Sequence, residues 1–138
     1  MSRHGFVPDI DTFTAIAEAA FAALPEEIRQ LTGEVQITIS DWPEPDAMRA
    51  VGVSHPLDLL GLFEGYGLAE YGALPQTGSF PNRIHLYREP ILRFTREGPD
   101  TLEEVIRHVL VHEIGNHFGL SDDDMYAIDD APDDDADA

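Results

Sequence analysis

The chain has no cysteine and no lysine, so all eight of its basic residues are arginines. Without cysteine, neither a disulfide nor a metal site built from thiolates can form. The eight arginines stand against 27 acidic residues, and the formal net charge is -19 at pH 7. Such an acid excess repels nucleic acid and anionic membrane surfaces, which both recruit patches of Lys and Arg. We therefore expect neither nucleic acid nor a membrane as a partner.

Long apolar runs are also missing. No stretch approaches the roughly 20 consecutive apolar residues that a membrane-spanning helix needs. The N-terminal residues lack the basic segment and apolar core of a signal peptide, so we expect a cytoplasmic location. The length of 138 residues and a hydrophobic content of 43% suit one domain with a single core.

The acidic residues are distributed unevenly. Residues 121–138 hold nine aspartates and no basic residue. The last ten residues are Asp, Ala and one Pro, a composition that buries no apolar surface. We predict a single folded domain over residues 1–128 and a disordered acidic tail over residues 129–138.

Apolar periodicity places the expected secondary structure. Alternation at period two predicts strands at residues 34–40 and 83–88, and a short apolar run between glycines predicts one at residues 60–65. Pro90 should end the strand at 83–88, with Ile91, Leu92 and Phe94 in a connection. Apolar residues at helical spacing, together with caps and breakers, predict helices at residues 13–24 after Asp9 or Asp11, 25–33, 45–50 and 101–119.

The last of these helices carries the strongest chemical signal. Residues four apart on a helix differ by about 40° in direction and about 6 Å in height, so positions 112 and 116 can face one ion. Glu113 follows His112 on the adjacent side, where a carboxylate can take a proton from a metal-bound water, whose pKa zinc lowers to about 7. Gly119 lets the chain turn back, so that Asp122 can add a third ligand. The spacing predicts a zinc site at His112, Asn116 and Asp122, with Glu113 as catalytic base.

These residues also carry a family resemblance. The segments 112–115, 117–122 and 124–125, with 23–27, 60–65 and 83–91 upstream, resemble the bacterial minimal-zincin metallopeptidases, whose motif is H-E-x-x-H-x-x-G-x-x-D. The resemblance covers most of residues 10–128. It implies an α+β fold in which a small mixed or mostly antiparallel sheet packs on an N-terminal helix and the motif helix. It further implies zinc, His112 and Asp122 as ligands, Glu113 as general base, and a peptide or protein substrate.

Asn116 departs from that motif, which has His at this position. A neutral amide oxygen is a poor substitute for imidazole at zinc, so we expect an impaired site. His117 lies about 140° around the helix from His112, so it could help only if the last turn unwinds. Three readings stay open: a zinc peptidase with a weakened or rearranged site, an inactive zincin scaffold, or a small domain whose His and Asp cluster is structural. The scaffold would capture an extended peptide or a protein by strand addition at its sheet edge, a hypothesis motivated by the strand at residues 83–88 and the Gly-rich stretch before it.

Overall fold

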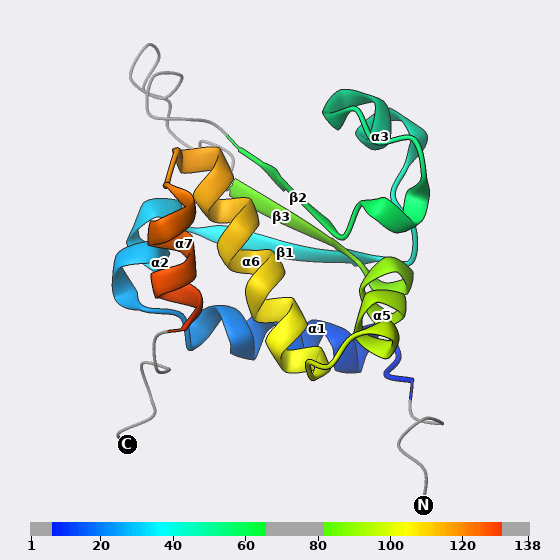
Figure 1. Cartoon of the computed structure of the whole chain (residues 1–138), viewed down its shortest axis with the longest axis horizontal. Coiled ribbons are helices and arrows are strands. Elements are labelled where there is room, and N and C mark those ends of the chain that lie inside the picture. The colour runs from blue at the N-terminus through cyan, green and yellow to red at the C-terminus, as the bar shows by residue number, and fades with distance from the viewer. Residues whose placement is uncertain (1–6, 66–81, 131–138) are drawn as a thin grey trace, which may run out of the picture.

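The computed structural model describes residues 7–65 and 82–130. These residues form an α+β fold of helices around a small mixed sheet, as predicted from the sequence (Figure 1). The elements in chain order are α1 (Ile10–Ala22), α2 (Glu26–Thr32), β1 (Val35–Ser40), α3 (Pro45–Val51), the 3-10 helix η2 (Pro56–Asp58), β2 (Gly61–Glu64), β3 (Asn82–Tyr87), α5 (Arg88–Glu97), α6 (Leu102–Phe118) and α7 (Asp122–Asp129).

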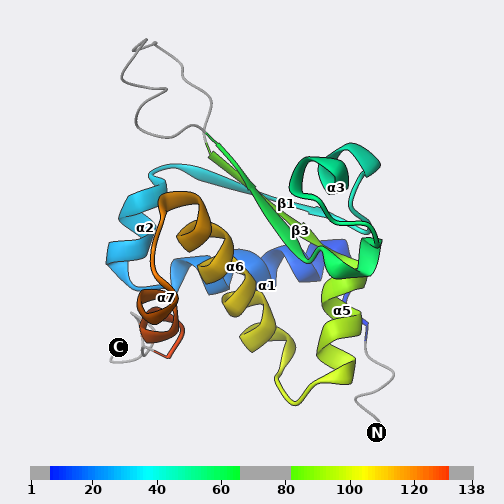
Figure 2. The same cartoon turned by 45° about the horizontal axis from the view of Figure 1, so that its top comes forward.

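The sheet is three-stranded in the described residues, with the order β1-β3-β2. β1 runs parallel to β3, and β2 runs antiparallel to it. Helices α1 and α6 lie against one face of the sheet (Figure 2). β3 therefore has a hydrogen-bonded neighbour on both sides. Residues 83–88 therefore offer no free backbone edge, and strand addition to this sheet would have to use β1 or β2.

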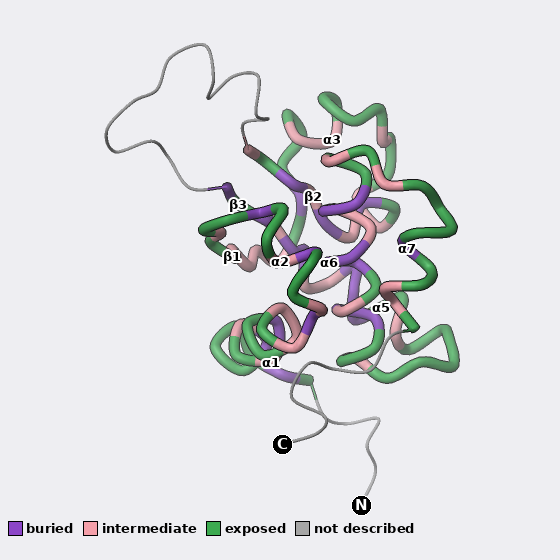
Figure 3. Tube along the Cα trace, turned by 90° about the vertical axis from the view of Figure 1, so that its left-hand side faces the viewer, coloured by how far each residue is buried: buried purple, intermediate pink, exposed green. Residues whose placement is uncertain are grey.

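Helix α6 runs through the middle of the core. Ile106, Leu110 and Ile114 are fully buried on this helix, and Ile84 of β3 is buried opposite. Figure 3 shows the buried stretches of α6 enclosed between neighbouring elements. Burying one such side chain stabilises a fold by about 1.5–3 kcal/mol. The helix that carries the motif is thus also the main support of the fold, which holds its side chains in fixed positions.

The predicted helix ends are confirmed where they bear on the site. Thr101 and Glu104 form a reciprocal capping box at the start of α6. Gly119 ends this helix with φ 77°, a left-handed conformation that favours glycine. Asp9 caps α1, accepting a hydrogen bond from the backbone amide of Thr12.

Two α-helices, α5 and α7, and the short 3-10 helix η2 were not predicted. Residues 91–94, expected in a connection, belong to α5, because Pro90 is tolerated in a first helical turn and Ile91 and Leu92 are buried. Helix α7 follows Ser121, whose side chain accepts a hydrogen bond from the amide of Asp124. Asp129, placed in the predicted tail, is the last residue of α7. Residues 131–138 of that tail lie outside the described residues.

None of the helices in residues 7–65 and 82–130 combines the length and the hydropathy that crossing a bilayer requires.

Candidate metal and catalytic site

His112 lies two turns before the end of α6, with its side chain partly buried. Its Nε2 atom is buried and has no hydrogen-bond partner among the described residues. A buried polar atom left unsatisfied costs about 1–3 kcal/mol, so native proteins keep few of them. A ligand or cation that accepts the lone pair of this nitrogen would account for the cost.

Glu113 occupies the space between α6 and β2. Burial raises the pKa of its carboxyl from 4.5 to about 7, and a hydrogen bond from the backbone amide of Phe63 offsets part of that rise. The amide of Tyr87 donates to the carbonyl of Leu60, so backbone groups at alternate positions of β2, including Phe63, point to the edge away from β3. Glu113 therefore sits at the outer edge of β2 with a pKa suited to taking a proton near neutral pH.

Asn116 and Asp122, the other two predicted ligands, are both exposed. Asn116 lies one turn beyond His112 on α6, and Asp122 is the first residue of α7. The carboxylate of Asp122 is close enough to raise the pKa of His112, although it is the weakest of four influences on that group. The structure thus leaves His112 and Glu113 partly buried on adjacent sides of α6, and leaves Asn116 and Asp122 exposed.

His117 does not take the place of Asn116. α6 remains α-helical through Phe118, so the last turn has not unwound. The imidazole of His117 stacks on the ring of Phe63, with centroids 4.3 Å apart and planes 30° from parallel. The alternative in which a rearranged turn carries His117 to the metal is therefore wrong for this structure.

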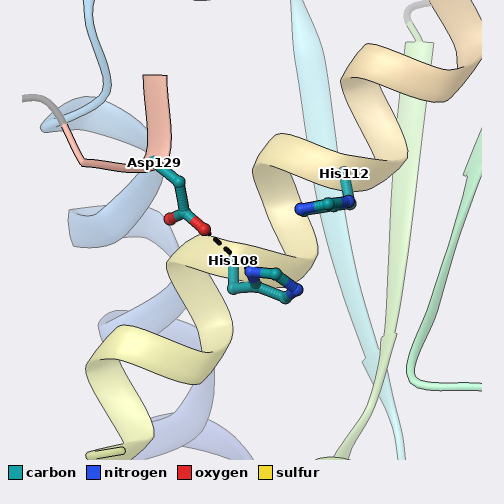
Figure 4. A group of neighbouring side chains, drawn as sticks. All are labelled: His108, His112 and Asp129. Atoms are coloured by element: carbon teal, nitrogen blue, oxygen red, sulfur yellow. Dashed lines mark hydrogen bonds and ion pairs between the residues drawn. The ribbon is translucent and has the colours of Figure 1, made fainter. Parts of the chain in front are cut away.

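A different group of ligands was missed by the sequence reasoning. One ligand atom each from His108, His112 and Asp129 all lie within 4.8 Å of one another (Figure 4). His108 Nδ1 is 2.7 Å from Asp129 Oδ2, and the two imidazole rings are 4.0 Å apart between centroids. His108 precedes His112 by four residues, so the helical spacing was readable in the sequence. The contribution of Asp129 could not be predicted, because this residue approaches the two histidines only through the packing of α7 against α6.

Burial and His108 both act on the ionisation of His112. Burial lowers its pKa most, the nearby imidazole of His108 lowers it further, and the charges of Asp129 and Asp122 raise it in part. The net shift is downward from 6.5. The neutral imidazole, which is the form that binds metals, is therefore favoured at neutral pH.

Helix α7 is seated tightly on α6. A Cβ atom placed on Gly115 would lie 2.4 Å from the sulfur of Met125, so only glycine permits this approach. Arg107 donates hydrogen bonds to the carbonyls of Ile128 and Asp129 at the end of α7, at 3.0 and 3.3 Å. Gly115 is thus explained by packing between the two helices, and α7 is held on α6 at Met125 and at its C-terminal end.

A helix carrying an adjacent His and Glu beneath the edge of a small mixed sheet is the arrangement of the zincin class of metallopeptidases. A family model described as zincin-like metallopeptidase matches residues 32–131, and the chain belongs to this family. The chain is also similar in fold to a conserved hypothetical protein from Thermus thermophilus, with 20% identity and a TM-score of 0.50, over 80% of this chain and 94% of the other. No curated protein matches the chain.

The family implies zinc, and the residues present fit it unevenly. The unpartnered Nε2 of His112 suits a cation, and the carboxylate of Asp122 is a donor that zinc accepts. The amide of Asn116 is a weak donor for zinc. The predicted set therefore offers two good ligands and one poor one.

Proposed function

We propose that this chain is a zincin-like metallopeptidase acting on peptide or protein substrates. In this proposal His112, Asn116 and Asp122 are the metal ligands, and Glu113 is the general base. The observation that carries it is the buried Nε2 of His112, without a partner in residues 7–65 and 82–130, directly followed by the partly buried carboxyl of Glu113, in a chain of this family. Asn116 makes the metal affinity low.

The chemistry divides between the metal and the chain. Zinc, when bound, supplies an acidified water at neutral pH. Glu113 accepts a proton on its carboxylate, and its pKa of about 7 places that group between its two forms at neutral pH. Partial burial of this carboxyl beside β2 is the cause of that raised pKa.

The outer edge of β2 supports a peptide as the substrate. Among the described strands, β2 has β3 on one side only, and its outward amide at Phe63 already reaches Glu113. An extended peptide that added to this edge would run past the general base. We therefore propose that strand addition uses this outer edge of β2.

The test is Asn116→His, compared with Asn116→Ala and with the double variant Asn116→His, Glu113→Gln. Zinc affinity by calorimetry should rise by more than about 100-fold in Asn116→His, because imidazole replaces an amide, and stay low in Asn116→Ala. Cleavage of an unfolded protein substrate should appear with the restored ligand. It should disappear in the double variant, which still binds zinc.

Unchanged zinc affinity in Asn116→His would contradict the ligand assignment. Restored zinc binding without cleavage, together with metal-independent binding of the same unfolded substrate, would instead support a peptide-binding scaffold. Asn116 favours that second candidate. A poor ligand at this position weakens zinc binding but leaves the edge of β2, where the peptide would bind, unaffected.

A further inference from the structure

His112 has a potential ligand four residues away in each direction along α6. On the C-terminal side this is Asn116, an exposed amide. On the N-terminal side it is His108, an imidazole. The geometry that lets residues four apart share one ion is the same in both directions, so the chemistry of the donor decides. An imidazole binds transition metals better than an amide oxygen does, so His108 is a better partner for His112 than Asn116 is.

Asp129 adds a third donor to His108 and His112, from another element. Figure 4 shows Asp129 reaching from the end of α7 toward the two imidazoles on α6. The carboxylate is only 19% exposed, and its Oδ2 accepts a hydrogen bond from His108 Nδ1. Arg107 Nε lies 3.9 Å from the other oxygen, Oδ1. The two oxygens thus have different neighbours, which fixes the orientation of the carboxylate.

The spacing of the three donors is close to what a small cation needs. Their ligand atoms lie within 4.8 Å of one another, whereas atoms bound tetrahedrally to zinc at about 2.0–2.1 Å would be about 3.4 Å apart. Side-chain rotations that move each ligand atom by on the order of 1 Å would bring the three donors to the tetrahedral separation. The Nε2 atom of His112 is buried and has no partner in the part of the chain that the structure describes, so no hydrogen bond seen there has to be broken.

We propose that His108, His112 and Asp129 form a second metal site, which binds a divalent transition metal such as Zn²⁺ and joins the end of α7 to α6. Two imidazoles and one carboxylate are a ligand set that zinc accepts, with the fourth position left to water. This site is distinct from the one in the proposed function, since Asn116 and Asp122 take no part in it. The two sites share His112, so an ion in one excludes an ion from the other.

The metal at this second site has a structural effect rather than a hydrolytic one. Glu113 follows His112 by one residue, and its carboxyl faces β2. Around the helix it lies about 120° from the direction midway between His108 and His112, at about 100° per residue. The general base is thus turned away from the ion. A bound ion adds to the existing contacts between α7 and α6, and its binding free energy should appear as stability of the fold.

The experiment is a titration of the full chain with Zn²⁺ alone, followed by calorimetry and by thermal unfolding. His108→Gln and Asp129→Asn should each weaken zinc binding by more than about 100-fold and remove the zinc-dependent rise in melting temperature. The matched controls are His55→Gln, an exposed His on another element, and Asp123→Asn, which makes the same charge change on α7. Both controls should bind zinc like the parent. Far-UV circular dichroism of each variant checks that it has folded, and Asp129→Asn is nearly isosteric.

Asp122→Asn and Asn116→His separate this proposal from the proposed function. In the parent chain, Asp129→Asn should weaken zinc binding far more than Asp122→Asn does, because Asp122 is a ligand only of the weaker site. In Asn116→His, the tighter site should depend on Asp122 and become indifferent to Asp129→Asn. Zinc binding that survives His108→Gln and Asp129→Asn but is lost in Asp122→Asn would overturn the second site. Failure of the parent chain to bind zinc at all would also overturn it, whereas the Asn116→His result would still test the peptidase assignment.

Discussion

The two neighbourhoods of His112 differ in what surrounds the same imidazole. Toward the end of α6 it faces an exposed amide at Asn116 and the exposed carboxylate of Asp122. Toward the start of α6 it faces the imidazole of His108 and a carboxylate held by hydrogen bonding at Asp129. Only the first side has Glu113 and the edge of β2 beside it. The better metal donors, His108 and Asp129, and the proposed general base, Glu113, therefore lie on opposite sides of His112.

That separation shows what a ligand motif leaves unspecified. Helical spacing makes a pair of positions suitable for one ion, but it does not say which of two pairs has the third donor. Here the third donor depends on where α7 packs. Because Met125 packs against Gly115, Asp129 lies beside the N-terminal half of α6. Asp122, at the other end of α7, stays exposed.

The largest effect is expected from removing the shared residue. His112→Ala should abolish zinc binding on both sides, in the parent chain and in Asn116→His, because each ligand set loses an imidazole. Calorimetry with Zn²⁺ measures the loss. Retention of a zinc site in His112→Ala would show that the two neighbourhoods do not share a ligand, and the comparison would fail.

Glu113→Gln should change how stability depends on pH. The carboxyl has a pKa of 4.5 when unfolded and about 7 when folded. Below pH 4.5 both states are protonated, and as pH rises toward 7 the unfolded state ionises first, so the free energy of unfolding falls. Glutamine stays neutral and escapes that fall. The stability advantage of Glu113→Gln should grow by about 2–3 kcal/mol from pH 5 to pH 8, at about 1.4 kcal/mol per pKa unit.

Urea unfolding of the metal-free protein at the two pH values measures that advantage. Glu18→Gln, an exposed Glu on α1, is the matched control and should show no comparable growth. An equal pH dependence in Glu113→Gln and the parent would mean that Glu113 is solvated. Glu113 would then not be a protected carboxyl on the β2 side of His112.

Gly115→Ala should test whether the packing of α7 sustains the second site. The added methyl would meet the sulfur and Cγ of the buried Met125, so that side chain, and α7 with it where it cannot turn aside, must move. Overpacking of this kind costs about 1–3 kcal/mol, which should exceed the roughly 1 kcal/mol that alanine gains over glycine in a helix. Thermal unfolding measures the net loss.

The same variant separates the two sides of His112. Zinc binding that depends on Asp129 should weaken in Gly115→Ala, because Asp129 moves with α7. Gly115→Ala, Met125→Ala provides the room for the methyl group and tests whether the clash is the cause, through partial recovery of zinc binding. Full zinc affinity in Gly115→Ala would mean that the position of Asp129 does not depend on this contact.

The smallest effect is expected at His117. His117→Ala should lower the free energy of unfolding by about 0.5–1.5 kcal/mol, the usual contribution of one aromatic stack, because its ring packs on Phe63. Zinc affinity should not change, since the ring faces β2 and belongs to neither ligand set. His117→Phe keeps the stack and should restore stability. A loss of zinc binding in both variants would return His117 to the list of ligands.

Much of the fold could be predicted from local sequence. Alternation located β1 and β3, a short apolar run between glycines located β2, and the Thr101–Glu104 capping box with Gly119 located both ends of α6. These features depend on hydrogen bonds and side-chain contacts between residues a few positions apart. The same locality explains why α5 was missed, since Pro90 was interpreted as a strand end, although a first helical turn tolerates it.

The candidate site divides along the same line. The sequence by itself determined the adjacent His112 and Glu113 on one helix and the weak donor at Asn116, because these follow from residue identity and helical period. Tertiary structure alone decided that β3 is central, that Glu113 is buried against the edge of β2, and that Asp129 meets His108. Those pairings join residues far apart in the sequence, and they depend on how whole elements pack to bury apolar surface, which no local pattern specifies.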